Sequence, residues 1–322
     1  MSRFLVRGAV LALLAALLGC GGGYKVTPGV QVDAGPSVSV PAQGGPATLD
    51  LANWNLDWFG DAGNGPVDDT LQVKQVQAVI QGMDCDLWGL EEVVDPAAFH
   101  ALLSGLPGYA GVLASDPQVT QGAAYYGATE QKVAFVYKTS LATVESAQVI
   151  LTDHDYDFAG RPPLEVKLQV GLNGASGTLY AIVLHAKAGS DAASYQRRAN
   201  AAAALKAYLD ATRAQDRVVV LGDFNDDLDT SITAGQPSPY QAFVADTAHY
   251  FTPTKALSDA GQGTYLSSYN SPDPIDHQVV SAAWAAQYLA GSAEAFHADQ
   301  YLPNYTSTTT DHRPVVTRWT GL

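Results

Sequence analysis

Runs of apolar residues at strand spacing dominate the chain after residue 47. Alternating or short continuous apolar runs of this kind are typical of β-strands. Strands are expected at Thr48–Trp54, Leu87–Leu90, Val133–Tyr137, Val144–Leu151, Leu164–Val170, Thr178–Leu184, Arg217–Leu221, Ile275–Val280 and Val315–Trp319. Both hairpin and crossover spacings separate them, so the pattern predicts an α/β (α+β) layered domain rather than a doubly wound parallel sheet.

Helical spacing occurs in fewer segments. Leu71, Val76, Val79 and Ile80 fall at helical intervals, and Asp68 precedes them as a helix-start signal. Helices are expected at Val67–Ile80, Pro96–Leu103, Asp191–Arg213 and Ala282–Leu289.

The N-terminus is typical of an export signal. Arg3 and Arg7 precede an apolar run from Ala9 to Leu18, which is too short to span a bilayer comfortably. The run ends in Leu-Leu-Gly-Cys20, which resembles the lipobox of bacterial lipoproteins. The alternative is an ordinary signal peptide that happens to contain a cysteine. We expect residues 1–19 to be a signal peptide and Cys20 to be lipidated, giving an exported, membrane-anchored lipoprotein, periplasmic or at the cell surface, with the outer membrane as the expected location.

A Gly-, Pro- and Val-rich segment follows the cysteine. It shows no helical period, so residues 20–47 are expected to form the lipidated Cys and a flexible tether. Residues 48–322 are then expected to form one domain.

Composition and charge exclude several classes of protein. Of the 322 residues, 47% are hydrophobic and 15% are charged, which excludes a disordered chain and a multi-span membrane protein. A net charge of -15 excludes a protein that coats nucleic acid by charge alone, although not an enzyme that grips one phosphate. The two cysteines exclude a disulfide scaffold and a Cys-rich zinc module, and the apolar neighbours of Cys85 predict a buried structural residue.

Polar side chains stand beside the ends of several predicted strands. These blocks are Asn53–Phe59, Leu90–Val93, Leu184–Lys187, Leu221–Asn225, Ile275–His277 and Thr310–Val315. Strand ends of one layered fold can converge on one pocket. The blocks supply oxygen ligands and two or three imidazoles, which favour Mg²⁺ or Mn²⁺ with acid–base catalysis over a structural zinc site.

Each block alone has a simpler interpretation. Asp223–Asp227 has the composition of a calcium loop, but Leu228 and Ala234 stand where the EF-hand needs Gly and Glu. His277 and His312, taken singly, are more often ordinary core histidines. The order of the blocks carries the interpretation.

That order resembles the endonuclease/exonuclease/phosphatase superfamily, which has the DNase I-like fold. The likeness runs from about Leu51 to Trp319. It is carried by Asn53–Gly60 (NWNLDWFG), Leu90–Val93 (LEEV), Phe158–Pro163 (FAGRPP), Leu184–Lys187 (LHAK), Gly222–Asn225 (GDFN), Ile275–His277 (IDH) and Thr310–Val315 (TDHRPV). The resemblance implies a four-layer α/β sandwich of two packed mixed sheets flanked by helices.

The resemblance also implies binding roles for individual residues. Glu92, Asn55 and Asp311 would hold Mg²⁺ or Mn²⁺, with Ca²⁺ as a further candidate. Arg161 and Asn225 would bind the substrate phosphate.

The catalytic roles follow from the same resemblance. His312 would accept the proton of the attacking water, and Asp276 would orient His312. His185 would protonate the leaving oxygen. Asp223 would orient the nucleophile or touch metal, and Asn225 would assist at the phosphate.

Several positions depart from the family pattern or stay open. Glu91 stands where Gln is usual. The family often pairs the His at the position of His185 with a carboxylate from a central strand. The alignment of that strand with this sequence stays open, and Glu130 is the candidate. A catalytic Tyr found in some members would match Tyr125 or Tyr126, or be absent.

Three functions remain compatible with the sequence. The first is a tethered, metal-dependent phosphodiester hydrolase, a nuclease with DNA or RNA as substrate, for which Lys187, Arg197 and Arg198 would form a small basic patch. The second is a phosphodiesterase or phosphatase on phospholipid headgroups or small phosphoesters, with Tyr265–Tyr269 as a weak candidate for a lipid-contacting hairpin. The third is a non-catalytic surface-binding lipoprotein. The sequence indicates no protein partner.

Overall fold

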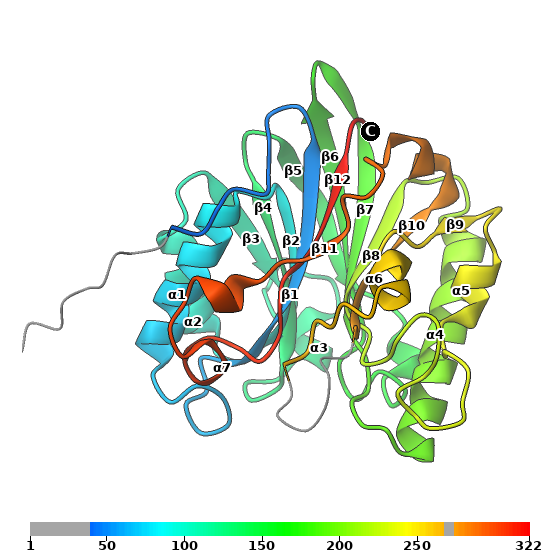
Figure 1. Ribbon diagram of the computed structural model, residues 1–322, viewed down its shortest axis with the longest axis horizontal. Coiled ribbons are helices and arrows are strands. Elements are labelled where there is room, and N and C mark those ends of the chain that lie inside the picture. The colour runs from blue at the N-terminus through cyan, green and yellow to red at the C-terminus, as the bar shows by residue number, and fades with distance from the viewer. Residues whose placement is uncertain (1–38, 267–273) are drawn as a thin grey trace, which may run out of the picture. The chain divides into compact units, whose positions relative to one another are not determined.

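The computed structural model describes residues 39–266 and 274–322, and within this part of the chain twelve strands form two six-stranded sheets (Figure 1). The first sheet has the strand order β11 (Glu294–Ala295), β12 (Val315–Trp319), β1 (Leu49–Phe59), β2 (Leu87–Val93), β4 (Lys132–Lys138) and β3 (Tyr109–Leu113). The second has the order β5 (Ala142–Val149), β6 (Leu164–Leu172), β7 (Ala175–His185), β8 (Val218–Asp223), β10 (Asp276–Ser281) and β9 (Tyr250–Phe251).

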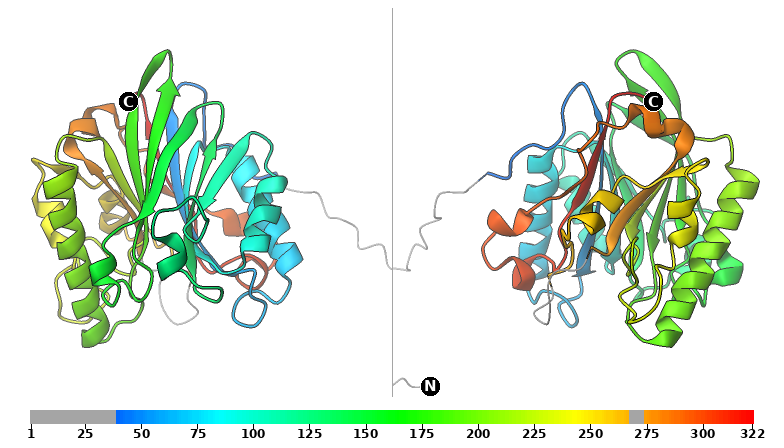
Figure 2. Two further views of the ribbon diagram at one scale, coloured as in Figure 1. Left: turned by 180° about the vertical axis from the view of Figure 1, so that it is seen from behind. Right: turned by 45° about the vertical axis from the view of Figure 1, so that its right-hand side comes forward.

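The two sheets pack face to face and helices cover their outer faces. Leu51, Leu87 and Val133 of the first sheet share one buried cluster with Val183 and Leu221 of the second. On the outer face of the first sheet lie α1 (Asp69–Met83) and α2 (Pro96–Ser104), and on that of the second lie α4 (Ala192–Thr212) and α5 (Gln241–Ala245) (Figures 1 and 2). The expected four-layer sandwich is confirmed.

Two parallel strand pairs set the position of the polar blocks. β1 runs parallel to β2, and β7 runs parallel to β8, whereas the other paired strands are antiparallel. Across the sheets, the side-chain amide of Asn53 donates to the carbonyl of Gly222 at 3.2 Å. The carboxyl ends of both parallel pairs therefore meet at one edge of the sandwich.

The long helices start where the sequence indicated. The Asp68 side chain accepts from the Leu71 amide at 2.9 Å, and the Asp191 side chain accepts from the Ala193 and Ser194 amides. These N-caps satisfy backbone donors that the first turn leaves free. Helix α1 consequently begins at Asp69 rather than at the expected Val67, which is exposed.

The expected helix over Ala282–Leu289 is wrong in type and length. A 3₁₀ helix spans Ala282–Gln287, and the buried Trp284 stacks on Trp319 at 4.3 Å between ring centroids. The tertiary packing of the Trp284 indole outweighs the α-helix propensity of the segment.

Several short elements were not predicted from the sequence, because they are too short to show a hydrophobic periodicity. They are β3, β9, β11, α3 (Gly122–Tyr125), α5, α6 (Lys255–Asp259), α7 (Tyr305–Thr308) and the 3₁₀ helices Thr152–His154 and Ala298–Gln300.

Residues 39–47, the described part of the expected tether, form no helix or strand but contact the domain. The backbone amides of Gln43 and Gly44 donate to the Met83 carbonyl, and the Arg318 side chain donates to the Gln43 carbonyl at 2.7 Å. Residues 1–19 and Cys20 lie outside the described residues. No helix in residues 39–266 or 274–322 has the length and apolar composition needed to cross a bilayer.

Candidate active site

The strand ends bring the predicted residues to one pocket. Asn55 lies on β1, Glu92 on β2, His185 ends β7 and Asp223 ends β8. Asp276 begins β10, while Asp311 and His312 precede β12. A cavity of about 450 Å³ is lined by Asp57, Trp58, Glu92, His185, Ala188, Gly189, Ser190, Asp223, Asn225, Ile232, Tyr265, Ile275, Asp311 and His312.

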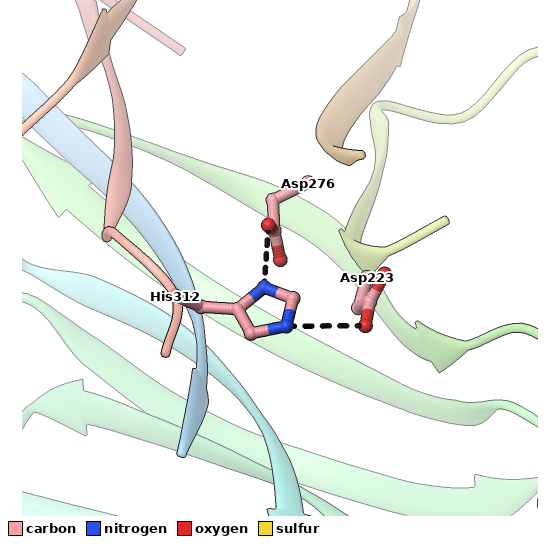
Figure 3. A group of neighbouring side chains, drawn as sticks. All are labelled: Asp223, Asp276 and His312. Atoms are coloured by element: carbon pink, nitrogen blue, oxygen red, sulfur yellow. Dashed lines mark hydrogen bonds and ion pairs between the residues drawn. The ribbon is translucent and has the colours of Figure 1, made fainter. Parts of the chain in front are cut away.

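The tightest group in the pocket is formed by Asp223, Asp276 and His312 (Figure 3). His312 Nδ1 lies 2.8 Å from Asp276 Oδ2, and His312 Nε2 lies 4.0 Å from Asp223 Oδ2. One ligand atom from each of the three lies within 4.8 Å of the others. A His–Asp pair with its second nitrogen facing the pocket is suited to proton transfer.

The electrostatics of this group are strongly perturbed. Burial, reinforced by Asp276, raises the pKa of Asp223 to about 7. Burial alone would lower the pKa of His312, but Asp276, Asp223 and Asp311 outweigh it and hold that pKa well above its ordinary value. Such clustering of perturbed groups in a cleft is typical of functional sites.

A second group surrounds Asn55. Its side-chain nitrogen donates to Glu92 Oε1 at 3.1 Å and to Asp223 Oδ2 at 2.9 Å. His185 Nε2 lies 3.6 Å from the same Glu92 oxygen and 3.5 Å from the same Asp223 oxygen. The amide nitrogen of Asn55, rather than its oxygen, thus faces the two carboxylates, because Asn55 Oδ1 accepts from the Asp57 amide at 3.0 Å.

The donor set fits a divalent cation. Carboxylates of Asp57, Glu92, Asp223 and Asp311 line the pocket, and oxygen donors of this kind are the ligands of Mg²⁺ and Mn²⁺. Burial raises the pKa of Asp57 to about 7, and the neighbouring carboxylates of Asp311 and Glu92 contribute to this rise. The trio of Asp223, Asp276 and His312 is a second arrangement able to hold a metal.

His185 has a different character from His312. Burial, together with Arg161, His312 and Lys187, lowers the pKa of His185 well below its ordinary value. A general acid must be protonated before it gives up a proton, and the burial of His185 beside cations disfavours its protonated form. His185 Nδ1 is buried without a hydrogen-bond partner among the described residues.

The expected phosphate-binding residues are tied to one backbone carbonyl. Ala186 accepts from Arg161 at 3.0 Å and from the side chain of Asn225 at 3.2 Å. Arg161 also donates to Gln131 Oε1, and Gln131 Nε2 donates to Glu92 Oε2 at 2.5 Å. Gln131 therefore links the phosphate side of the pocket to the carboxylate side.

The local backbone is held in unusual conformations at the site. Glu92 and Asn225 have φ values of 60° and 50°, in the left-handed region that side chains seldom adopt. Such conformations persist where the surrounding structure imposes them. Gly222 has φ of 143°, and a Cβ there would collide with the Leu184 carbonyl oxygen, so the Gly of GDFN is required by the close approach of β7 and β8.

Hydroxyl groups fix the loops that carry Asp276 and His312. Thr310 Oγ1 donates to the Asn55 carbonyl at 2.7 Å and accepts from the His312 amide at 3.1 Å. Thr264 Oγ1 accepts from the backbone amides of Ile275 and Asp276. Thr310, which stands in place of the family's usual Ser, thus keeps a hydroxyl in a positioning role.

Two hypotheses drawn from the sequence do not agree with this geometry. Glu130 accepts from the Gly127 amide, so the carboxylates beside His185 are Glu92 and Asp223 instead. Neither Tyr125 nor Tyr126 lines the pocket, and the hydroxyl of the buried Tyr126 donates to the Pro162 carbonyl. The physical reason is register: the short helix α3 turns both rings toward the core between the sheets.

The basic patch also needs correction. Arg198 is fully buried, with Nε 2.8 Å from Asp226 Oδ2, and donates to the carbonyls of Lys187 and Gly189. It is a structural residue beneath the loop, and only Lys187 and Arg197 remain partly exposed.

Three further interpretations concern single residues. His277 is a buried core histidine, 2.6 Å from the Pro274 carbonyl through Nε2. Cys85 is buried as expected. Of the hairpin candidate Tyr265–Tyr269, residues 267–269 lie outside the described residues, and Leu266 packs against the outer core of the first sheet.

Some residues of the site could not be recognised from the sequence, because their polar groups reach the site only through contacts between distant segments. Gln131 and Thr264 carry no motif signal, and Asp57 was hidden inside the first motif. Only the position of Gln131, directly before a strand, could have drawn attention to it.

Comparison with family models decides the classification. The model of the endonuclease/exonuclease/phosphatase family matches residues 52–312. The chain belongs to this family. Membership indicates a phosphoester hydrolase. A sequence search among curated proteins finds no match.

Solved structures of the same fold agree with the family assignment. An endonuclease/exonuclease/phosphatase from Bacteroides vulgatus has 16% identity and a TM-score of 0.57, over 84% of this chain and 98% of that one. The human Nocturnin catalytic domain with bound sulfate has 16% identity and a TM-score of 0.56, over 84% and 93%. D. rerio TDP2 complexed with single-strand DNA product has 14% identity and a TM-score of 0.56, over 84% and 98%. At these identities the likeness is one of fold.

Proposed function

We propose that this family member is a divalent-metal-dependent phosphodiesterase, a nuclease acting on DNA or RNA. One observation carries the proposal: the His312–Asp276 pair faces the carboxylates of Glu92 and Asp223 in the same pocket, beside Arg161 and Asn225. A proton acceptor, a cation-binding set and phosphate donors are the parts that phosphodiester hydrolysis requires.

The His–Asp pair supplies the proton acceptor. In its neutral form, with Nδ1–H donated to Asp276, His312 presents Nε2 as the acceptor for the proton of an attacking water. Asp276 fixes this tautomer and stabilises the imidazolium that forms.

Arg161 and Asn225 act at the phosphate. The Ala186 carbonyl accepts a hydrogen bond from each side chain and so holds the two donors beside one another. Preorganised donors of this kind stabilise charge that develops in the transition state. His185, held neutral by burial, serves here as a further hydrogen-bond donor rather than as the general acid.

Glu92, Asp311 and Asn55 would hold the cation, with Asp223 adjacent. When bound, Mg²⁺ or Mn²⁺ neutralises the charge on a non-bridging phosphate oxygen. Ligation through Asn55 requires its amide oxygen to turn toward Glu92, away from the Asp57 amide.

Nucleic acid is the favoured substrate class. D. rerio TDP2, which shares the fold, is complexed with a single-strand DNA product. The phospholipid alternative has less support, because Leu266 packs against the core instead of offering an apolar surface. A binding protein without catalysis has no need of the His312–Asp276 pair.

Export and anchoring complete the proposal. We propose that residues 1–19 are removed, that Cys20 is lipidated and that the domain acts at a membrane surface in the periplasm or outside the cell. Metabolic labelling with a radioactive fatty acid tests this, since Cys20→Ser should abolish the label.

Plasmid cleavage tests the activity. The purified protein should nick supercoiled plasmid or cut single-stranded RNA with Mg²⁺ or Mn²⁺ and lose this activity in EDTA. His312→Ala should remove it, while His297→Ala, at a half-exposed histidine outside the pocket, should keep it. A folded protein that cuts neither nucleic acid, or a His312→Ala protein with full turnover, contradicts the proposal.

A further inference from the structure

Three cations without a carboxylate partner lie beside the pocket. Eight of the fourteen lysines and arginines in the described residues form ion pairs with carboxylates, and three of the six that do not are Arg161, Lys187 and Arg197. The pKa of Lys187 is lowered by burial and then by Arg197 and Arg161, so these charges act on one another. In a chain of net charge -15, an uncompensated basic group indicates a site for an anion.

The three cations lie near one another, and Lys187 directly precedes residues that line the pocket. Lys187 follows Ala186, whose carbonyl fixes Arg161 and Asn225, and the next residues, Ala188–Ser190, line the pocket. Lys187 and Arg197 are therefore the cations available to a phosphate next to the one that Arg161 would bind.

An exposed aromatic ring packs against one of these cations, Arg197. Tyr156 is 72% exposed, in the loop that leads to Arg161, and the Arg197 guanidinium lies 4.2 Å from its ring centroid. Arg197 also donates to the Tyr156 carbonyl, at 2.9 Å from Nε, and Asn200 donates to Asp157 at 3.1 Å. These contacts attach the loop to helix α4 and leave the Tyr156 ring exposed to solvent.

The exposed ring of Tyr156 contributes little to folding stability, so its ordered position calls for another explanation. Aromatic residues bury large areas and contribute most when covered. A ring stacked on a guanidinium beside a phosphate site offers a surface for an unpaired base.

We propose that Tyr156, Arg197 and Lys187 form a nucleotide subsite that binds one unpaired base and its phosphate next to the scissile bond. The base stacks on Tyr156, and the phosphate is bound by Lys187 and Arg197. The inference rests on the proposed function and narrows its substrate to single-stranded nucleic acid, since a duplex keeps its bases paired. With this phosphate and the one proposed to bind Arg161, about two phosphates are neutralised, so log Kd should change with log salt concentration by about 1.4, at roughly 0.7 per phosphate for single strands.

Fluorescence anisotropy on the full chain carrying His312→Ala tests this, because that background does not cut the probe. The probes are a labelled ten-nucleotide single strand, its duplex, and an abasic sugar-phosphate strand of equal length. We expect the single strand to bind at least tenfold more tightly than the duplex. Tyr156→Ala should weaken single-strand binding about 5- to 100-fold, from the usual stacking contribution, and leave abasic binding unchanged.

Matched variants separate stacking, charge and folding. Tyr156→Phe should bind like the parent because it keeps the ring. Arg197→Ala should weaken both strands, whereas Arg217→Ala, the same change beside the opposite end of β8, should not. Three results would overturn the subsite. They are equal single-strand affinity in Tyr156→Ala and its parent, equal affinity of the parent for single strand and duplex, and the absence of saturable binding.

Its failure is distinguishable from that of the proposed function. Plasmid or RNA cleavage by the wild-type protein without a Tyr156 effect rejects the subsite alone. Binding that depends on Tyr156 without any cleavage rejects the nuclease and retains the subsite.

Discussion

His312 donates from Nδ1 to Asp276 at 2.8 Å, joining the loop before β12 to the first residue of β10. The two residues come from different sheets, so this hydrogen bond spans the pocket and sets which nitrogen of His312 faces the substrate. Asp276→Asn keeps the shape but loses the charge that supports the imidazolium. We expect kcat to fall about 10²- to 10⁴-fold, the usual contribution of acid–base catalysis.

Metal affinity measured on the same variant provides the control. Mn²⁺ binding followed by electron paramagnetic resonance should stay within about threefold of wild type. An equal loss of Mn²⁺ affinity would instead assign Asp276 to the metal, as the compact trio with Asp223 allows.

Glu92 is expected to hold the cation through its carboxylate. Glu92→Gln should lower Mn²⁺ affinity at least about tenfold, since even residues outside the ligand set change affinity by 10- to 100-fold. Glu91→Gln makes the same chemical change one residue away. Both Glu91 oxygens are buried without a hydrogen-bond partner in the described part of the chain, and burial raises the pKa of Glu91 well above its ordinary value. Mn²⁺ affinity unchanged in Glu92→Gln, or lost equally in both variants, would reject the assignment.

Arg198 is predicted to matter for stability rather than for substrate. Arg198→Met leaves Asp226 buried without its partner, so the free energy of unfolding should fall by about 3–5 kcal/mol. Arg197→Met, at the neighbouring and partly exposed position, should cost less than about 1 kcal/mol. Urea denaturation compares the two, and similar losses would show that burial of Arg198 is not decisive.

His277 is predicted to make stability depend on pH. Burial lowers the pKa of His277 from 6.5 to about 4, so the folded protein keeps this residue neutral while the unfolded chain takes up a proton below pH 6.5. Its contribution to stability is present above pH 6.5 and is lost as the pH falls toward 4, by about 3 kcal/mol in all.

Urea denaturation between pH 7 and pH 4 measures this effect. His277→Gln should flatten the pH dependence, and His249→Gln provides the same substitution at an exposed histidine. A wild-type curve that His277→Gln leaves unaltered would mean that other groups set the acid sensitivity.

The sequence allowed prediction of the residues at strand ends but not of the contacts between them. GDFN and TDHRPV place Asp223 and His312 beside strands, and layered packing then brings them together. Gln131 could not be recognised, because its role depends on reaching Glu92 and Arg161 from a third segment. The sequence favoured a surface position for Arg198, because an alanine-rich helix shows no clear polar face.

The pairing of β1 with β12 makes assembly of the pocket an all-or-none event during synthesis. Asn55 and Glu92 are made early, but the strand that positions His312 inserts between β1 and β11 only after residues 315–319 have been added. An incomplete polypeptide on the ribosome therefore carries most of the carboxylates and no working hydrolytic centre. If the protein cleaves nucleic acid as proposed, the order in which the strands are made would protect the nucleic acid near the site of translation.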